Sequence, residues 1–400
     1  MKILHTSDWH IGQIFKNFSR QVEHEMFFSW LKDIIVEQKI DVLLVAGDIF
    51  DVANPSSSAL KTYYNFLTSL QTTNCKKIII TGGNHDGIST LDAPKELLEV
   101  LNISVISGEK EFMSDKENLI IKLKDSEDEL SAIVCAVPFL RDSVVRKSLL
   151  NQSSADVETQ LKEGITKYYK DSLELAISIS DKVPVIAMGH LSVIGSSISD
   201  SEQDIYIGKL QSLNSSIFDG YDYVALGHLH KAQKVASNEY IRYSGSPICL
   251  SFSEIANDKK VLIFDTKTST VDEVVIPRFR KLFHIKGSFD DVMETLLSME
   301  SYTLTPFVEL SIENEYVTSE LHSLIYEKTK DLDIEILQIN SQNKDSEIRT
   351  EMEVESLDDI TPLKAFETKC DENSTLIDDE LKASIVDCFK EILEMTNEDS

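Results

Sequence analysis

Five short apolar runs of this chain end beside residues that commonly bind metal ions, and this pattern constrains the fold most strongly. One run, Lys77–Thr81, leads into Gly82-Gly83-Asn84-His85-Asp86-Gly87, where glycines on both sides let the backbone bend tightly. Ligands gather at the carboxyl edge of parallel strands, so we expect the side chains at all five run ends to converge. The other four ends carry Asp8 with His10, Asp48, His190, and His228 with His230.

Longer segments with helical spacing separate the first apolar runs. Residues 19–38 and 56–71 are predicted helices, and residues 41–47 form an apolar strand stopped by glycine. This β-α-β-α-β order predicts an α/β fold with a largely parallel sheet covered by helices. Further helices are predicted at 91–101 and 155–179. The apolar stripes of 56–71 and 91–101 suit either the core or self-association. Further strands are predicted at 103–106, 119–123, 131–137, 185–188, 223–226, 240–243 and 260–265.

The pattern changes after Pro277. Strands at 282–285, 307–312 and 334–339 and helices at 289–297 and 319–329 predict a compact α+β unit. We therefore divide the chain into residues 1–280, 281–342 and 343–400. From residue 346 to 400 there are 17 acidic and 5 basic residues, yet apolar residues keep helical spacing at 363–366 and 381–393. Because disordered acidic tails lack such stripes, we interpret the tail as partner-binding helices rather than disorder.

Composition narrows the classes of function. No run approaches the roughly 18 apolar residues of a membrane helix, and the chain starts directly with strand-like sequence, which predicts a cytoplasmic protein without membrane partners. Its five cysteines lie singly, which argues against a disulfide framework or a zinc–thiolate site. A net charge of −29 repels phosphate at long range. A nucleic-acid function would therefore need positive charge from a metal site or a partner.

The ligand candidates combine carboxylate, imidazole and amide groups, a set that suits manganese and also iron, zinc or magnesium. Taken singly, His190 could be a core residue and Asp8 a turn cap. Asp-x-His and His-x-His pairs, however, let both side chains face one ion. Seven ligands are too many for one ion, so we expect two ions about 3.5–4 Å apart that share one carboxylate and activate water against a phosphoryl group. The seven are Asp8, His10, Asp48, Asn84, His190, His228 and His230.

The run ends resemble, in order, the five motifs of the calcineurin-like metallophosphoesterases. These are Asp8-Trp9-His10, Gly47-Asp48-Ile49-Phe50-Asp51, Gly83-Asn84-His85-Asp86, Gly189-His190 and Gly227-His228-Leu229-His230. More narrowly, residues 5–10, 204–208 and 242–247 resemble the SbcD family, the nuclease subunits of bacterial SbcC–SbcD complexes. The resemblance implies a β-sandwich flanked by helices, followed by a small α+β capping domain and a C-terminal helical tail.

The resemblance also implies how the ligands are shared between two ions, with Asp48 as the bridge. One ion would be held by Asp8, His10, Asp48 and His230, and the other by Asp48, Asn84, His190 and His228. The ions would be manganese, with magnesium as the alternative.

Two further residues receive catalytic roles from the resemblance. His85 would face the scissile phosphate as general acid or donor to the leaving oxygen, with Asp86 orienting its ring. The alternative for His85 is a supporting hydrogen bond. Some relatives carry a histidine just after the second motif, where this chain has Asp51, so that role does not transfer. Three residues are candidates for phosphate or DNA-backbone contact, with ordinary packing as the alternative: Tyr206, Arg242 and Tyr243.

The resemblance implies that the chain would hydrolyse DNA as a 3′→5′ double-strand exonuclease and a single-strand or hairpin endonuclease in replication, repair and recombination. It would form a homodimer and a heterotetramer with two copies of an SbcC-type ATPase. That ATPase would receive the acidic tail and supply basic DNA-binding surface. One alternative function is that of a phosphomonoesterase or cyclic-nucleotide phosphodiesterase, but the α+β unit and the tail argue against it. Another is a non-catalytic scaffold, but the complete set of metal ligands argues against that.

Overall fold

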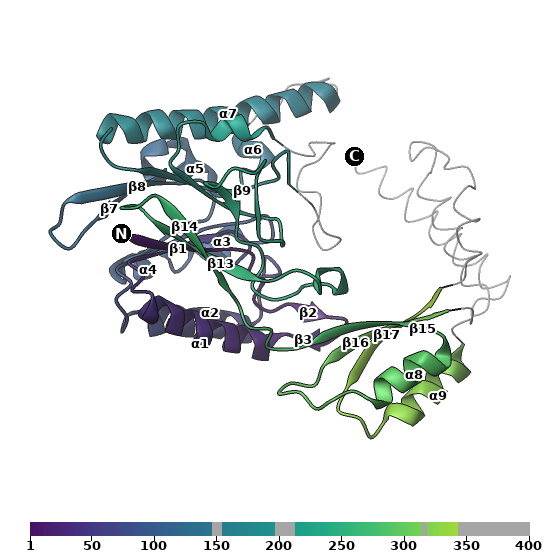
Figure 1. Ribbon diagram of the computed structural model, residues 1–400. Coiled ribbons are helices and arrows are strands. Elements are labelled where there is room, and N and C mark those ends of the chain that lie inside the picture. Colours follow the sequence, from purple (N-terminus) through teal and green to yellow (C-terminus); the bar gives the residue numbers. More distant parts are fainter. Residues whose placement is uncertain (146–153, 197–212, 314–317, 343–400) are drawn as a thin grey trace. The chain divides into compact units, whose positions relative to one another are not determined.

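Two six-stranded sheets stack on each other and helices cover their outer faces (Figure 1). The computed structural model describes residues 1–145, 154–196, 213–313 and 318–342. The first sheet has the order β14 (Thr270–Val275), β13 (Lys260–Asp265), β1 (Lys2–Thr6), β4 (Val42–Ala46), β5 (Lys77–Thr81), β6 (Ile103–Ile106). The second has the order β11 (Gln233–Lys234), β12 (Ile241–Tyr243), β10 (Tyr223–Gly227), β9 (Val185–His190), β8 (Leu130–Ala136), β7 (Ile120–Lys124).

Each sheet contains four parallel strands and two antiparallel ones. The strands β1, β4, β5 and β6 pair in parallel, as do β12, β10, β9 and β8. The antiparallel strands are β13 and β14 at one side of the first sheet, and β11 and β7 at the two edges of the second. The largely parallel sheet predicted from the β-α-β-α-β order is found in the first sheet, whereas the order of strands along the chain did not reveal that the later strands form a second sheet. The flanked sandwich that the family resemblance implied is confirmed.

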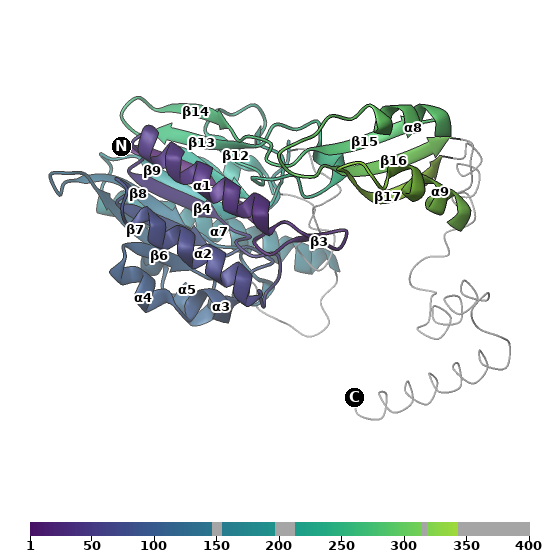
Figure 2. The same ribbon diagram turned by 90° about the horizontal axis from the view of Figure 1, so that it is seen from below.

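Successive residues of the first sheet face two different cores. Leu43 packs with residues of α1 (Gln21–Glu37) and α2 (Ser57–Leu70), whereas Leu44 packs with residues of the second sheet. This alternation is the two-residue period of a strand buried on both faces. Figure 2 shows α1 and α2 lying side by side across the first sheet. The long helix α7 (Ser154–Ile179) covers the outer face of the second sheet at β8 and β9.

The prediction of one continuous helix over residues 91–101 is wrong. It consists of α3 (Ile88–Asp92) and α4 (Lys95–Val100), interrupted at Pro94, which lacks the N–H that a helix interior needs. The apolar stripe of α2 lies in the core, so its proposed role in self-association is not supported. The remaining short elements are β2 (Ile14–Phe15), β3 (Phe18–Ser19), α5 (Lys110–Ser114), η1 (Lys116–Leu119), α6 (Asp142–Val145), η2 (Ser215–Phe218) and η3 (Phe252–Glu254).

The predicted α+β unit after Pro277 is a three-stranded sheet with two helices. Its strand order is β15 (Leu282–Gly287), β16 (Phe307–Glu313), β17 (Glu335–Gln342), and its helices are α8 (Phe289–Leu297) and α9 (Ser319–Thr329). Residues Met1–Ser311 and Thr318–Asn340 form one compact unit. The tail helices lie outside the described residues, and the three domain boundaries stay a prediction. Among the described residues, no helix has both the length and the apolarity to cross a bilayer.

A buried carboxylate on α1 binds two arginines. Glu23 is fully buried, and its Oε1 accepts hydrogen bonds from Arg20 Nε at 2.7 Å and Arg280 Nε at 2.6 Å. Removing this carboxylate leaves two cations without their partner. We expect Glu23→Ala to lower the free energy of unfolding by about 3–5 kcal/mol, measured by chemical denaturation. The control is Glu25→Ala on the exposed face of the same helix, and equal losses in the two variants would contradict the expectation.

Candidate metal centre

The loops after β1 and β4 are fastened together at the carboxyl edge of the first sheet. The N–H of Asp8 donates to Gly47 O and the N–H of His10 donates to Asp48 O, both at 3.0 Å. Asp8, His10 and Asp48 have positive φ angles of 51°, 46° and 49°, a backbone region that non-glycine residues rarely adopt. Strain of this kind concentrates at functional sites, where the surrounding structure holds it in place.

The second sheet brings its histidines to the same edge. His190 ends β9, and its Nδ1 lies 3.0 Å from Ala46 O of β4. The N–H of His228, just after β10, donates to Asp8 Oδ1 at 2.8 Å. The sheets approach so closely that a Cβ on Gly227 would lie 1.8 Å from Ala46 O. Glycine at this position is therefore required for the two sets of residues to meet.

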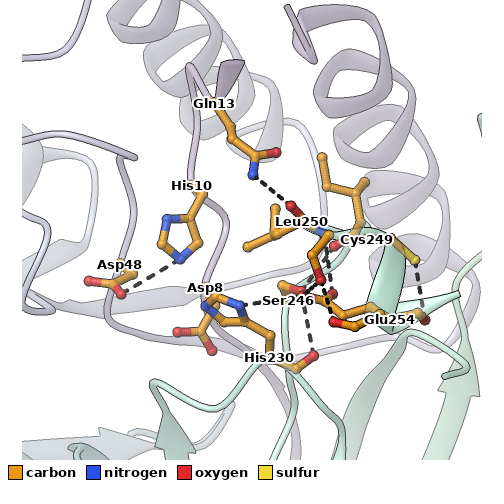
Figure 3. A network of polar contacts seen from close by, with 12 residues as sticks. Asp8, His10, Gln13, Asp48, His230, Ser246, Cys249, Leu250 and Glu254 are labelled. Carbon is orange, nitrogen blue, oxygen red and sulfur yellow. Dashed lines mark hydrogen bonds and ion pairs between the residues drawn. The ribbon is translucent and has the colours of Figure 1, made fainter. Parts of the chain in front are cut away.

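All seven predicted ligands converge at this edge. Asp48 Oδ2 lies 3.6 Å from His10 Nε2 and 3.3 Å from His190 Nε2, and His190 Nε2 lies 2.9 Å from Asn84 Oδ1. The ring of His228 lies 5.5 Å from that of His190. Figure 3 shows Asp8, His10, Asp48 and His230 around the same place. Three groups have one ligand atom per residue within 4.8 Å of one another: Asp8 with His10 and His230, His10 with Asp48 and His85, and Asp8 with Asp48 and His190.

These residues fit divalent cations. Both ring nitrogens of His10 are buried and form no hydrogen bond, although buried polar atoms are normally paired. A cation among these oxygen and imidazole ligands would satisfy that ring, and the donor set suits borderline or hard ions. The assignment of each residue to a particular ion stays a prediction.

Burial and mutual charge set the protonation of the site. Burial raises the pKa of Asp8 to about 7. Burial alone would also raise the pKa of Asp48, but the charge and hydrogen bond of His190 outweigh it and hold that pKa below its ordinary range. Burial lowers the pKa of His228 to about 3 and that of His230 to about 4, so both rings are neutral at pH 7 and can bind a cation.

Asp48 also affects His190, the histidine nearest to its carboxylate. Burial would lower the pKa of His190, but the charge and hydrogen bond of Asp48 outweigh it and raise the pKa to about 9. The proton that His190 carries is the one that a divalent cation would displace, because metal ligands must be deprotonated.

The loop after β5 holds His85 differently from the prediction. His85 Nδ1 lies 2.8 Å from the carbonyl oxygen of Asp51, so Asp51 rather than Asp86 orients this ring. The buried Asp86 carboxylate accepts hydrogen bonds from the N–H groups of Gly83, Ile49 and Phe50 at 2.8–3.1 Å. Asp86 therefore fastens the His85 loop to the Asp48 loop.

Sequence reasoning missed the part that Asp51 takes in the site. Its Oδ1 lies 3.3 Å from His10 Nδ1, and its carbonyl oxygen contacts His85. The sequence marked Asp51 only as the place where some relatives carry a histidine. Nothing in the neighbouring residues Val52 and Ala53 indicates that Asp51 contacts two histidines of the site.

Comparison with known proteins identifies the family. A calcineurin-like phosphoesterase model matches residues 1–232, and a model described as the Type 5 capsule protein repressor C-terminal domain matches residues 278–374. The chain is 32% identical over 375 residues to the SbcD subunit of nuclease SbcCD from Escherichia coli strain K12, covering 92% of each chain. The chain belongs to the SbcD nuclease family.

Other SbcD proteins are similar over different lengths. The SbcD subunit of nuclease SbcCD from Rhodobacter capsulatus is 35% identical, and the match covers 66% of each chain. The SbcD protein of Bacillus subtilis is 28% identical, and the match covers 90% of this chain and 91% of its own. As a member of the SbcD family, this chain is a metal-dependent nuclease that hydrolyses phosphodiester bonds.

Two of the three residues predicted to contact substrate in this SbcD chain are buried in a strand. Arg242 and Tyr243 are buried in β12, where Arg242 pairs with Glu273 and the Tyr243 hydroxyl donates to Leu191 O at 2.7 Å. This placement favours the packing alternative for both. Tyr206 lies outside the described residues. Trp9, which lies between Asp8 and His10, is buried against Phe28 and donates to Thr6 Oγ1 at 3.1 Å, so it supports the loop that carries these ligands.

Proposed function

We propose that this chain hydrolyses DNA phosphodiester bonds with two divalent cations that share Asp48. One cation would be held by Asp8, His10, Asp48 and His230, and the other by Asp48, Asn84, His190 and His228. The observation that carries the proposal is the Asp48 carboxylate, whose Oδ2 lies within 3.6 Å of ring nitrogens from both sheets. Manganese is the proposed ion, supported by the mixed oxygen and imidazole donors.

The two cations would supply an activated water and neutralise charge on the phosphoryl group. The chain's own residues place the substrate and its leaving group. Substrate must approach from the open groove beside the ligands, which is lined in part by His10, Gln13, Lys16, Asp51, His85 and His230. His85 is half-buried at the edge of this groove, whereas Asp8 and Asp48 are fully buried. We therefore assign His85 the donation of a hydrogen bond or proton to the leaving oxygen.

The net charge of −29 supports a partner in DNA binding. The relatives are named as one part of the SbcCD nuclease, which supports an SbcC-type ATPase as that partner. We propose that residues 281–342 position DNA, that residues 343–400 dock on the ATPase, and that two copies of each chain assemble. We also propose 3′→5′ exonuclease action on double-stranded DNA and endonuclease action on single strands or hairpins. A cytoplasmic location is supported by the unpaired Cys75, Cys135 and Cys249.

A nuclease assay tests this proposal. The purified chain is incubated with blunt duplex, hairpin and single-stranded DNA in manganese or magnesium, with and without the ATPase partner. We expect manganese-dependent cleavage of DNA that the partner accelerates. Asp48→Asn prepared in the same way controls for contaminating nucleases. Cleavage of p-nitrophenyl phosphate esters without cleavage of DNA would favour a phosphomonoesterase or small-molecule phosphodiesterase, and hydrolysis of neither would favour a scaffold.

A further inference from the structure

Three histidines of the site direct Nδ1 toward a protein oxygen. His190 Nδ1 lies 3.0 Å from Ala46 O, His85 Nδ1 lies 2.8 Å from Asp51 O, and His10 Nδ1 lies 3.3 Å from Asp51 Oδ1. For His10 and His190, Nε2 is the nitrogen near Asp48. The backbone carbonyls at Nδ1 of His190 and His85 keep a proton on that nitrogen, so His190 can bind a cation through Nε2 once the proton there is displaced.

His230 directs its Nδ1 toward a fully buried carboxylate. Its Nδ1 lies 3.6 Å from Oε1 of Glu254, a residue of η3 that is fully buried (Figure 3). This distance is slightly longer than a hydrogen bond, and a small rotation of either side chain closes it. Because Nδ1 faces Glu254, Nε2 is the nitrogen of His230 on the side of Asp8 and His10, with which it forms a candidate metal group.

The two oxygens of Glu254 face different groups. Oε2 accepts from Lys259 Nζ at 2.5 Å and from the N–H of Leu250 at 3.2 Å. Oε1 has His230 Nδ1 at 3.6 Å and Ser251 Oγ at 3.5 Å. Lys259 stabilises the negative charge of the buried Glu254 carboxylate through Oε2. The other oxygen, Oε1, stays directed at His230.

Lys259 also fixes the backbone of the same histidine. Its Nζ donates to His230 O at 3.0 Å and to Ser246 Oγ at 2.7 Å, and it is itself buried. The lysine and the glutamate together hold both the main chain and the ring of His230. A buried ion pair that only filled space would not need to contact one histidine at two places.

We propose that Glu254 is a positioning residue that accepts the Nδ1–H of His230 and directs its Nε2 to the cation shared with Asp8 and His10. This inference rests on the proposed two-cation function. Carboxylates in this position orient the ligand ring and make its other nitrogen more basic, and their loss typically weakens metal binding about 10–100-fold. The effect should fall on the His230 cation and leave the His190 cation unchanged.

Manganese titration of the full chain, followed by electron paramagnetic resonance and calorimetry, tests the proposal. In Glu254→Gln we expect one of the two manganese sites to weaken about 10-fold or more while the other keeps its affinity. The matched control is Glu309→Gln, because Glu309 Oε2 faces His284 Nδ1 at 3.7 Å in the three-stranded sheet, outside the site. Equal weakening of both manganese sites would indicate general damage and overturn the positioning role.

A double variant tests the proposal independently of Glu254→Gln. Glu254→Met with Lys259→Met removes both buried charges together, which leaves no unpaired ion, and should also weaken only one manganese site. Unchanged affinity in both variants would overturn the proposal. Wild-type chain that binds no manganese and cleaves no DNA would instead refute the proposed function.

The tautomer itself can be read in the wild-type protein without metal. Long-range ¹H–¹⁵N spectra, assigned by His230→Asn, should show His230 protonated at Nδ1 at pH 7.5. A His230 ring protonated at Nε2 would overturn the proposal whatever the variants do.

Discussion

Asp48→Asn should lose both manganese ions and lower the rate of DNA cleavage by at least about 10³-fold. Asparagine keeps the shape of the side chain but removes the carboxylate charge of Asp48, whose Oδ2 lies 3.6 Å from His10 Nε2 and 3.3 Å from His190 Nε2. Because Asp48 is buried, no anion from the solvent can take the place of its carboxylate as a metal ligand. Metal content by elemental analysis and cleavage of duplex DNA under the same conditions measure the two losses.

Asp41→Asn is the matched control for this prediction. Asp41 precedes the same strand, β4, at its other end, and its Oδ2 accepts from the N–H of Lys2 at 2.9 Å. An asparagine oxygen can keep that hydrogen bond, so metal content and cleavage should stay as in the wild type. Retention of both ions by Asp48→Asn would contradict the shared role of Asp48, even if cleavage fell.

The positions of the ligands could be predicted because strand ends are visible in a sequence. Apolar runs such as Lys77–Thr81 and residues 41–47 mark where strands stop, and parallel strands stop at a common edge. Asp48 follows such a run directly and Asn84 follows one after two glycines, and the structure places both at the site. The partition of the strands between two sheets was not visible, because β8 and β9 look like strands of the first sheet until their pairing is known.

The residues that support the ligands could not be predicted in the same way. Glu254 lies in η3, 24 residues after His230, and nothing in Ser251-Phe252-Ser253-Glu254 indicates a buried carboxylate. Contacts of this kind depend on how a loop folds back, and loops follow no period that a sequence shows. The error about Asp86 has the same origin. Asp86 is next to His85 in the sequence, but its carboxylate accepts hydrogen bonds from three backbone N–H groups, those of Gly83, Ile49 and Phe50.

This difference between Asp86 and Asp51 changes what each substitution near His85 should do. Loss of the Asp86 carboxylate leaves buried N–H groups of Gly83, Ile49 and Phe50 without an acceptor, so it should disturb the loops that carry Asn84 and Asp48. The His85 ring, by contrast, is oriented by a backbone oxygen of Asp51 and lies at the edge of the site. Of the two catalytic candidates, His85 alone can therefore be changed while the ligand loops stay in place.

His85→Gln should keep both manganese ions and lower the rate of DNA cleavage about 10²–10⁴-fold, the usual contribution of a positioned acid or base. Glutamine can still hydrogen-bond to Asp51 but cannot give a proton to the leaving oxygen. A substrate whose leaving group needs no proton, such as a p-nitrophenyl ester of thymidine monophosphate, should lose much less rate than DNA does. Equal loss on both substrates would refute the role as proton donor, and loss of manganese would make His85 a ligand, as its place beside His10 and Asp48 allows.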